Sequence, residues 1–453
     1  MDAGTLAKLL SREGRALLSA LPPYDEKQAM VLAEGLRKRG VDPDLAAAAL
    51  TQTRLRAKAA AKLGPFADGM YFTPDGLEQA TRLTVAALHA RRYVAAGVTR
   101  VADLTCGIGA DSLAFAGVGL EVLATDIDLV TAMIAKVNLR PFPEAEVRHL
   151  DGLSLDLAVE RVDGIYADPA RRKGGKRIFD PAAYAPPLDA VWALRSQASA
   201  VGIKVGPGVP HQGLPEDAEV QWVSVDGDVV EAGLWFGPLA LDGPGRSALL
   251  LREHEGRTLS RELRAAPPSV VEPAEIADAG TSLVSTRAAS DPTQPTDPGR
   301  LSRERSDRVE TTTTDGGVGE YVYEPDGAVI RAGLVAEAAA ELGGCLLNPT
   351  IAYITTDSPA PAISVDPALG QAPIATGYRV LDTMPFGVKR LKAYLRERDV
   401  GRVTIKKRGT AVTPETLRPQ LSLRGNNEAT IILTRIGPAQ SILIVEPLSQ
   451  QPA

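Results

Sequence analysis

The chain has 453 residues, of which 44% are hydrophobic and 4% aromatic, with a formal net charge of -6 and a mean hydropathy of -0.04. This length predicts two or three domains, because single hydrophobic cores stop growing well below it. The acidic balance excludes a uniformly basic protein that coats nucleic acid, although it leaves room for local basic surfaces.

Several further classes are excluded by what the sequence lacks. Cys106 and Cys345 are the only cysteines, and the four histidines are scattered, so we expect neither a disulfide framework nor a metal site. No segment approaches the roughly 18 consecutive apolar residues of a membrane helix. The N-terminal residues lack the basic start and apolar core of a signal peptide. We therefore expect a cytoplasmic protein with no membrane partner.

The first half of the chain predicts a helical module followed by an α/β core. Residues 1–96 contain periodic helical segments separated by glycine and proline. In residues 97–240, short apolar strands alternate with helices, which predicts a parallel sheet covered by helices. The last two strands of this core, "EVQWVSVD" and "VVEAGLWFG", lie so close together that we expect a hairpin at the edge of the sheet.

The second half is predicted to contain a linker and a smaller domain. Residues 241–318 are interpreted as a linker with a disordered insertion, because residues 267–318 are rich in Pro, Thr, Asp and Arg and poor in aromatics. Residues 319–374 are interpreted as a connecting α/β segment. Residues 375–453 are expected to form a small α/β domain, with two helices covering one face of its sheet.

The stretch "VADLTCGIGADSL", residues 101–113, predicts a ligand-binding turn after the first strand. Ser112 stands where a dinucleotide fingerprint has its third glycine, and no Gly-Lys-Ser/Thr follows as in a phosphate loop. Acidic residues close three successive strands at Asp103, Asp126 and Asp151. We expect them at the carboxyl edge of the sheet, where Asp126 suits a ribose diol and Asp151 an adenine amino group.

The runs "DLTCGIGADSLAFA", "ATDID" and "DG" resemble motifs one to three of class I S-adenosylmethionine-dependent methyltransferases. This resemblance implies a Rossmann-like seven-stranded methyltransferase sheet, with S-adenosylmethionine as the cofactor. An NAD-type Rossmann domain, or a sheet that has lost its ligand, is the alternative. The cofactor-binding residues that the resemblance implies are Asp103, Thr105, Gly107, Gly109, Asp126, Ile127, Asp151 and Gly152.

The fourth strand ends in "DPARR", residues 168–172, which resembles the Asn/Asp-Pro-Pro-aromatic motif of nucleic-acid amino-methyltransferases. The resemblance implies that Asp168 and the carbonyl of the next residue accept the hydrogens of an exocyclic amine, while Pro169 fixes the turn. Arg171 replaces the aromatic residue, so it is expected either to stack on a flipped base or to bind phosphate. Asp168, Pro169 and Arg171 are therefore the catalytic candidates. The alternative is that Asp168 caps a helix or pairs with Arg172.

Further segments, most of them outside the α/β core, narrow the resemblance to one family. "GMYFTPDGLEQAT", "FDPAAYAPPLD", "YVYEPDGAVIRAGL" and the basic end segment are similar to bacterial methyltransferases with a C-terminal THUMP-like domain, which more distantly resemble the trimethylguanosine synthase group. Because THUMP domains are RNA-binding modules, this resemblance implies an RNA partner, tRNA or rRNA.

Basic clusters supply candidate RNA contacts. Arg54, Lys58 and Lys62 recur every four residues, which places them on one helical face. Residues 389–408 contain nine Lys or Arg residues and two acids. A solvated helix face is the alternative for either cluster. The candidate RNA-binding residues are Arg54, Lys58, Lys62, Arg172, Lys406, Lys407, Arg408 and Arg424.

The sequence thus favours an enzyme that methylates an exocyclic amino group of a base in structured RNA. An RNA-binding scaffold with a retained methyltransferase fold, or a small-molecule methyltransferase, is the alternative. A 5-methylcytosine enzyme is disfavoured because Cys106 lies inside the predicted cofactor turn and Cys345 beyond the core. A hydrolase is disfavoured because the Gly-x-Ser-x-Gly elbow is absent.

Overall fold

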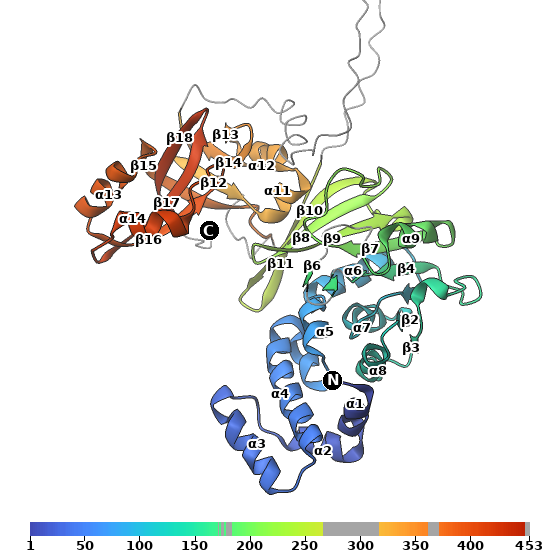
Figure 1. Cartoon of the computed structure of the whole chain (residues 1–453). Helices are drawn as coiled ribbons and strands as arrows, with labels where there is room; N and C mark the ends of the chain where they lie inside the picture. Colours follow the sequence, from blue (N-terminus) through green and yellow to red (C-terminus); the bar gives the residue numbers. More distant parts are fainter. Residues whose placement is uncertain (171, 174–175, 178–183, 266–316, 361–370, 449–453) are drawn as a thin grey trace, which may run out of the picture. The chain divides into compact units, whose positions relative to one another are not determined.

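The computed structural model describes residues 1–170, 172–173, 176–177, 184–265, 317–360 and 371–448 (Figure 1). The chain forms two compact units. The first unit comprises Met1–Val209, Pro215–Glu219 and Ala232–Pro244, and the second comprises Pro210–Leu214, Val220–Glu231 and Gly245–Ala453.

The predicted N-terminal helices are confirmed and belong to the first unit, where they are blue in Figure 1. Local sequence explains the starts of two of these helices, because Asp2 and Asp42 accept hydrogen bonds from the Thr5 and Leu45 amides as helix N-caps. Except for the helix over residues 29–38, their apolar faces join one core with the strands and helices that follow. The helices are α1 (Ala3–Leu10), α2 (Arg12–Ala20), α3 (Ala29–Lys38), α4 (Pro43–Leu63), α5 (Pro74–Gln79) and α6 (Leu83–Ala95).

The larger sheet has nine strands in the order β11-β10-β8-β9-β7-β4-β1-β2-β3. The strands β1 to β4 and β7 pair in parallel, as predicted, and β9 runs antiparallel to β7. The strands are β1 (Arg100–Asp103), β2 (Glu121–Asp126), β3 (Ala145–His149), β4 (Gly164–Ala167), β7 (Ala200–Val205), β8 (Glu219–Val225), β9 (Asp228–Phe236), β10 (Gly245–His254) and β11 (Arg257–Arg264). The helices among them are α7 (Ala110–Gly117), α8 (Leu129–Asn138) and α9 (Leu188–Ala193).

Two predictions about this sheet need correction. The seven predicted strands are present, but β10 and β11 extend the sheet from within residues 241–318, which were interpreted as a linker. The turn between these strands places Glu255 and Gly256 at positive φ, as in a tight hairpin. The β8–β9 pair is consequently interior, because β10 lies next to β8. The predicted disordered insertion falls largely on residues 266–316, outside the described residues.

The second sheet has seven strands in the order β13-β14-β12-β15-β18-β17-β16. The strands are β12 (Tyr321–Pro325), β13 (Cys345–Asn348), β14 (Ile351–Thr356), β15 (Ala375–Pro385), β16 (Val400–Lys407), β17 (Asn427–Ile436) and β18 (Ala439–Pro447). Because β12 pairs with β15 over five residues, residues 319–374 are part of the C-terminal sheet rather than a separate connecting segment. The helices α11 (Gly327–Ala332) and α12 (Val335–Leu342) lie between β12 and β13 in the chain.

The expected pair of helices on one face of this sheet is confirmed. These are α13 (Val388–Glu397) and α14 (Pro414–Leu421). They bury Leu391, Leu395, Leu417 and Leu421 in one core with Ile431, Leu433, Ile442 and Ile444 of β17 and β18. The alternate residues Ile432, Leu443 and Val445 belong to a second core. Period-two alternation along β17 and β18 therefore gives this sheet two buried faces.

Candidate functional site

The carboxyl edge of the larger sheet gathers the predicted acids and the glycine turn. β1 ends at Asp103 and β2 at Asp126, while Asp151 follows the end of β3 by two residues. Gly107 and Gly109 have φ values of +55° and +88°, a region that favours glycine, and Gly109 is the N-cap of α7. The Gly107 amide donates a hydrogen bond to Asp126 Oδ2 at 3.1 Å. The end of β2 therefore holds the turn that follows β1.

The electrostatic environment differs among these acids. Burial raises the pKa of Asp103, whose residue is 1% exposed, to about 8, and the Ser112 hydroxyl donates to its Oδ2 at 2.5 Å. Burial also raises the pKa of Asp126. Asp151 is exposed, and the Ile127 side chain is 73% exposed beside the end of β2. The edge thus combines a buried carboxyl group, two more accessible ones and an exposed apolar surface.

Two of the predicted cofactor residues, Gly152 and Thr105, have structural roles. A Cβ at Gly152 would lie 2.5 Å from the Leu104 carbonyl oxygen, so close packing explains this glycine. Thr105 Oγ1 accepts a hydrogen bond from the Asp168 amide at 2.7 Å. Thr105 therefore connects the glycine turn to the residue after β4.

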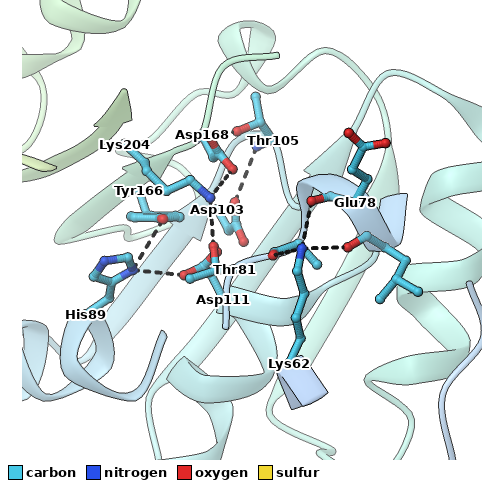
Figure 2. Close-up of polar contacts among 12 residues, drawn as sticks. Lys62, Glu78, Thr81, His89, Asp103, Thr105, Asp111, Tyr166, Asp168 and Lys204 are labelled. Carbon is cyan, nitrogen blue, oxygen red and sulfur yellow. Dashed lines mark hydrogen bonds and ion pairs between the residues drawn. The ribbon is translucent and has the colours of Figure 1, made fainter. Parts of the chain in front are cut away.

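Asp168 is held by a lysine that the sequence analysis missed. Lys204 Nζ lies 2.6 Å from Asp168 Oδ2, and the side chains are 4% and 22% exposed, respectively (Figure 2). Lys204 also donates to Thr81 Oγ1 at 2.7 Å. The signal was a single lysine in the apolar run "AVGIKVG" of β7, because a lysine is seldom buried without a partner. Asp168 therefore pairs with Lys204, while the side chains of Arg171 and Arg172 lie outside what the structure describes.

A polar chain continues from Lys204 into the core. Thr81 donates to Asp111 Oδ2 at 2.6 Å, and Asp111 Oδ1 lies 2.9 Å from His89 Nδ1 (Figure 2). Burial alone would raise the pKa of Asp111, but the contacts with His89, Lys204 and Thr81 lower it. Thr81 ends the segment "GMYFTPDGLEQAT", so this motif is tied to the Asp168 site through Lys204.

Lys62 also serves this segment rather than an exposed RNA-binding face. Its ammonium donates to the carbonyl oxygens of Leu77, Glu78 and Ala80 at 2.9, 2.7 and 3.2 Å. Burial, together with the charges of Arg82 and Lys204, lowers the pKa of Lys62 to about 8. Lys62 thus satisfies carbonyl groups at the end of α5. Its predicted role was a contact with RNA phosphate, and this role within the protein was not predicted.

The remaining basic candidates divide into two groups. Lys406 and Arg408 both pair with Glu324, at 2.8 and 3.1 Å, so they connect β16 and the turn after it to β12. The residues Arg54, Lys58, Lys407 and Arg424 are exposed. Three of the eight predicted RNA contacts, Lys62, Lys406 and Arg408, are therefore engaged within the protein.

The buried Cys106 is a poor nucleophile, as the sequence analysis expected. Burial raises the pKa of its thiol well above the usual value. Within the described part of the chain, no group of three or more His, Cys, Asp or Glu side chains is arranged to hold a metal ion. No helix there is both long enough and apolar enough to span a membrane.

Together, the parallel strands, the antiparallel β9 between β7 and β8, and the glycine turn held by Asp126 define the Rossmann-like methyltransferase class of fold. The chain is 31% identical over 394 residues to uncharacterized S-adenosylmethionine-dependent methyltransferases from two strains of Mycobacterium tuberculosis, CDC 1551 and H37Rv. The match covers 85% of this chain and 91% of each relative. The chain therefore belongs to the S-adenosylmethionine-dependent methyltransferases, which confirms the predicted enzyme class and cofactor.

Further comparisons concern the fold and the terminal regions. A crystal structure from Porphyromonas gingivalis W83, assigned as a methyltransferase, has a TM-score of 0.65 at 20% identity. It covers 94% of this chain and 100% of that one. Residues 375–447 match the THUMP domain-like family, as predicted, and residues 2–59 match a domain family of unknown function. The fold and the C-terminal domain type are thus confirmed, whereas the comparisons leave the substrate open.

Proposed function

We propose that the protein transfers the methyl group of S-adenosylmethionine to an exocyclic amino group of a base in structured RNA, tRNA or rRNA. The observation that carries the proposal is the carboxylate of Asp168, held by Lys204 at the carboxyl edge of the sheet. Asp168 begins the sequence Asp-Pro-Ala-Arg, which resembles the amine-holding motif of nucleic-acid methyltransferases.

The residues of the glycine turn fit the proposed cofactor. Gly107 leaves open space where a side chain would stand, so a ligand can lie against its backbone. In our proposal, the buried carboxyl group of Asp103 holds the amino group of the methionine part and Asp126 holds the ribose diol. The exposed side chain of Ile127, just after β2, supplies an apolar surface for adenine. Asp151 follows β3, the next strand in the chain. When bound, the cofactor supplies an electrophilic methyl group.

Catalysis in this proposal rests on alignment rather than on a covalent enzyme intermediate. Asp168 and the carbonyl of Pro169 accept hydrogen bonds from the amine and direct its lone pair toward the methyl carbon. Once the amine carried the methyl group it would lose one proton, for which the Asp168 carboxylate would be the acceptor. Lys204 compensates the charge of that carboxylate and fixes its orientation.

An RNA substrate is supported by the THUMP-like match over residues 375–447 and by the exposed basic residues Lys407 and Arg424 in the same region. Phosphate contacts of this kind give affinity that depends strongly on salt and little on sequence. Selection of the methylated base then falls to the Asp168 site.

The test is methyl incorporation into RNA isolated from cells that lack the enzyme, with Asp168→Ala beside the wild type. We expect Asp168→Ala to lose at least 100-fold in rate while RNA affinity stays within twofold. Asp189→Ala is the matched control, because Asp189 is an exposed acid of the same unit. A wild-type enzyme that binds S-adenosylmethionine but methylates no RNA would contradict the proposal.

A further inference from the structure

The first unit contains a cavity of about 510 Å³ away from the residues assigned to the cofactor. Side chains from α2 and α4, from the 3-10 helix η2 (Gly64–Gly69), and from α8 and the turn after it line this cavity. A volume of this size is typical of small-molecule sites. Asp103, Gly107, Gly109, Asp126 and Asp168 do not line it, so it is distinct from the carboxyl edge of the sheet.

The cavity carries an excess of positive charge. Three arginines, Arg15, Arg56 and Arg140, and one acid, Asp68, line its wall. The guanidinium group of Arg56 is fixed, because its Nε donates to the Met70 carbonyl at 2.9 Å. Within the described residues, the side chains of Arg15 and Arg140 make no hydrogen bond or ion pair, and both residues are exposed. The cavity therefore presents guanidinium groups that can bind an anion.

Aromatic rings form another part of the wall. Tyr71 is buried, Phe142 is half-buried, and Phe66 is 44% exposed. The guanidinium carbon of Arg56 lies 5.1 Å from the centre of the Tyr71 ring. Guanidinium groups beside aromatic rings suit a ligand that has both phosphate and a planar base.

One residue of the cavity wall is hydrogen-bonded to the glycine turn of the proposed cofactor site. Asn138 lines the cavity, and its Nδ2 donates to the carbonyl oxygens of Tyr71 and Ile108 at 3.0 and 2.9 Å. Its Oδ1 accepts from the Tyr71 amide at 2.8 Å. Ile108 lies between Gly107 and Gly109, so one buried side chain joins the cavity wall to the turn. A ligand in the cavity would contact residues that position the cofactor site.

We propose that this cavity binds one nucleotide of the RNA substrate, with its phosphate at Arg15 and Arg140 and its base against the aromatic wall. This inference rests on the proposed function in taking RNA as the substrate. It adds a specific anchoring site on the N-terminal helices, separate from the exposed basic residues of the THUMP-like region.

The test measures the affinity of the full-length protein for a fluorescent single-stranded RNA oligonucleotide. The test variants are Arg15→Glu and Arg140→Glu, and the controls are Arg12→Glu on α2 and Lys136→Glu on α8. Both control residues are exposed and do not line the cavity. Arg12 shares α2 with Arg15, and Lys136 lies on α8, which ends two residues before Arg140. Each test variant is expected to lose at least tenfold in RNA affinity, and each control less than twofold. The slope of log affinity against log salt should become shallower by about 0.7 for each lost phosphate contact.

A nucleoside monophosphate identifies the part of the RNA that is recognised. We expect it to displace the oligonucleotide from the wild type at millimolar concentration and to bind Arg140→Glu at least tenfold more weakly. Binding of the monophosphate without any effect of the variants on RNA would indicate a free-nucleotide site and overturn the assignment to RNA. Unchanged RNA affinity in both variants, with unchanged S-adenosylmethionine binding as the check on folding, would also overturn it.

The two proposals fail in different ways. If the wild type methylates RNA but Arg15→Glu and Arg140→Glu bind RNA normally, the anchoring site is wrong and the proposed reaction stands. If the variants lose RNA affinity but the wild type methylates no RNA, the anchoring site stands as an RNA-binding site and the proposed reaction is wrong.

Discussion

The ammonium group of Lys204 lies 2.6 Å from the Asp168 carboxylate, and the lysine side chain is only 4% exposed. Lys204 stands near the end of β7, whereas Asp168 follows the neighbouring strand β4. The pair thus forms across adjacent parallel strands at their carboxyl ends. Removing one member of a buried pair leaves the other charge uncompensated, so both the stability and the geometry of the site depend on Lys204.

Replacing Lys204 by methionine should therefore impair the enzyme in two ways. We expect the free energy of unfolding to fall by about 3 kcal/mol, because the Asp168 charge loses its partner. We expect the rate of methyl transfer to fall at least 100-fold, because Asp168 is no longer held, while affinity for S-adenosylmethionine stays within a few-fold. Urea unfolding and single-turnover methylation measure the two effects separately.

A matched substitution in an exposed ion pair supplies the control. Arg379 pairs with Glu446, and their side chains are 54% and 56% exposed, so Arg379→Met should leave the free energy of unfolding nearly unchanged. The double variant Lys204→Met/Asp168→Asn should regain stability without regaining activity, because it removes both charges. Wild-type activity in Lys204→Met would show that the lysine does not position Asp168.

The buried carboxyl group of Asp103 predicts a pH dependence of cofactor binding. With a pKa of about 8, Asp103 carries a proton at pH 6 to 7 in the cofactor-free protein. Because the proposed partner of Asp103 is a cationic amino group, binding requires this proton to leave. The Kd for S-adenosylmethionine should then fall by up to tenfold per pH unit between pH 6 and 8 and level off above pH 8. Calorimetry in buffers of different ionisation enthalpy should detect the released proton.

The same group predicts a trend in stability. Between about pH 4 and 8, the folded protein keeps a proton on Asp103 that the unfolded chain, with a pKa near 3.8, has already released. The contribution of Asp103 to stability is therefore present below this range and declines as the pH rises through it. Asp103→Asn should remove both this decline and the proton release. Proton release that persists in Asp103→Asn would assign it to another group.

The parts of the fold that local sequence encodes could be predicted. Short apolar runs that end in Asp103, Asp126 or Asp168 indicated parallel strands, because apolar runs between turns are typical of such sheets. The β12–β15 pairing could not be predicted in this way, since it joins segments about 50 residues apart in the chain. The β10–β11 hairpin was missed because the composition of the region after it dominated the interpretation of residues 241–318.

The site shows a similar division. The positions of Asp103 and Asp126 follow from strand ends, but the pairing of Asp168 with Lys204 depends on which strands are neighbours. Helical periodicity placed Lys62 on a face of α4, yet it carries no information on what covers that face. The residues at the end of α5 lie against that face, and their carbonyl groups accept hydrogen bonds from Lys62. This contact is visible only in the tertiary structure.

The basic residues of the second unit should separate into structural and RNA-binding groups. Lys406→Met should destabilise this unit by about 1 to 3 kcal/mol, because Glu324 is only 20% exposed and loses a partner. Lys407→Glu and Arg424→Glu, at exposed positions, should leave stability unchanged and lower RNA affinity several-fold. Thermal unfolding and RNA titration distinguish the groups. If Lys407→Glu and Arg424→Glu both bind RNA like the wild type, the THUMP-like region does not bind RNA through these residues.

Asp126 offers the most direct test of the cofactor site. Its carboxylate accepts a hydrogen bond from the Gly107 amide and is the proposed partner of the ribose diol. Asp126→Ala should therefore raise the Kd for S-adenosylmethionine about tenfold to 100-fold. Asp128→Ala is the control, because Asp128 caps α8 through the Thr131 amide. This control should cost about 1 kcal/mol of stability without weakening the cofactor. Equal cofactor affinity in Asp126→Ala and the wild type, measured by calorimetry, would mean that the ribose is held elsewhere.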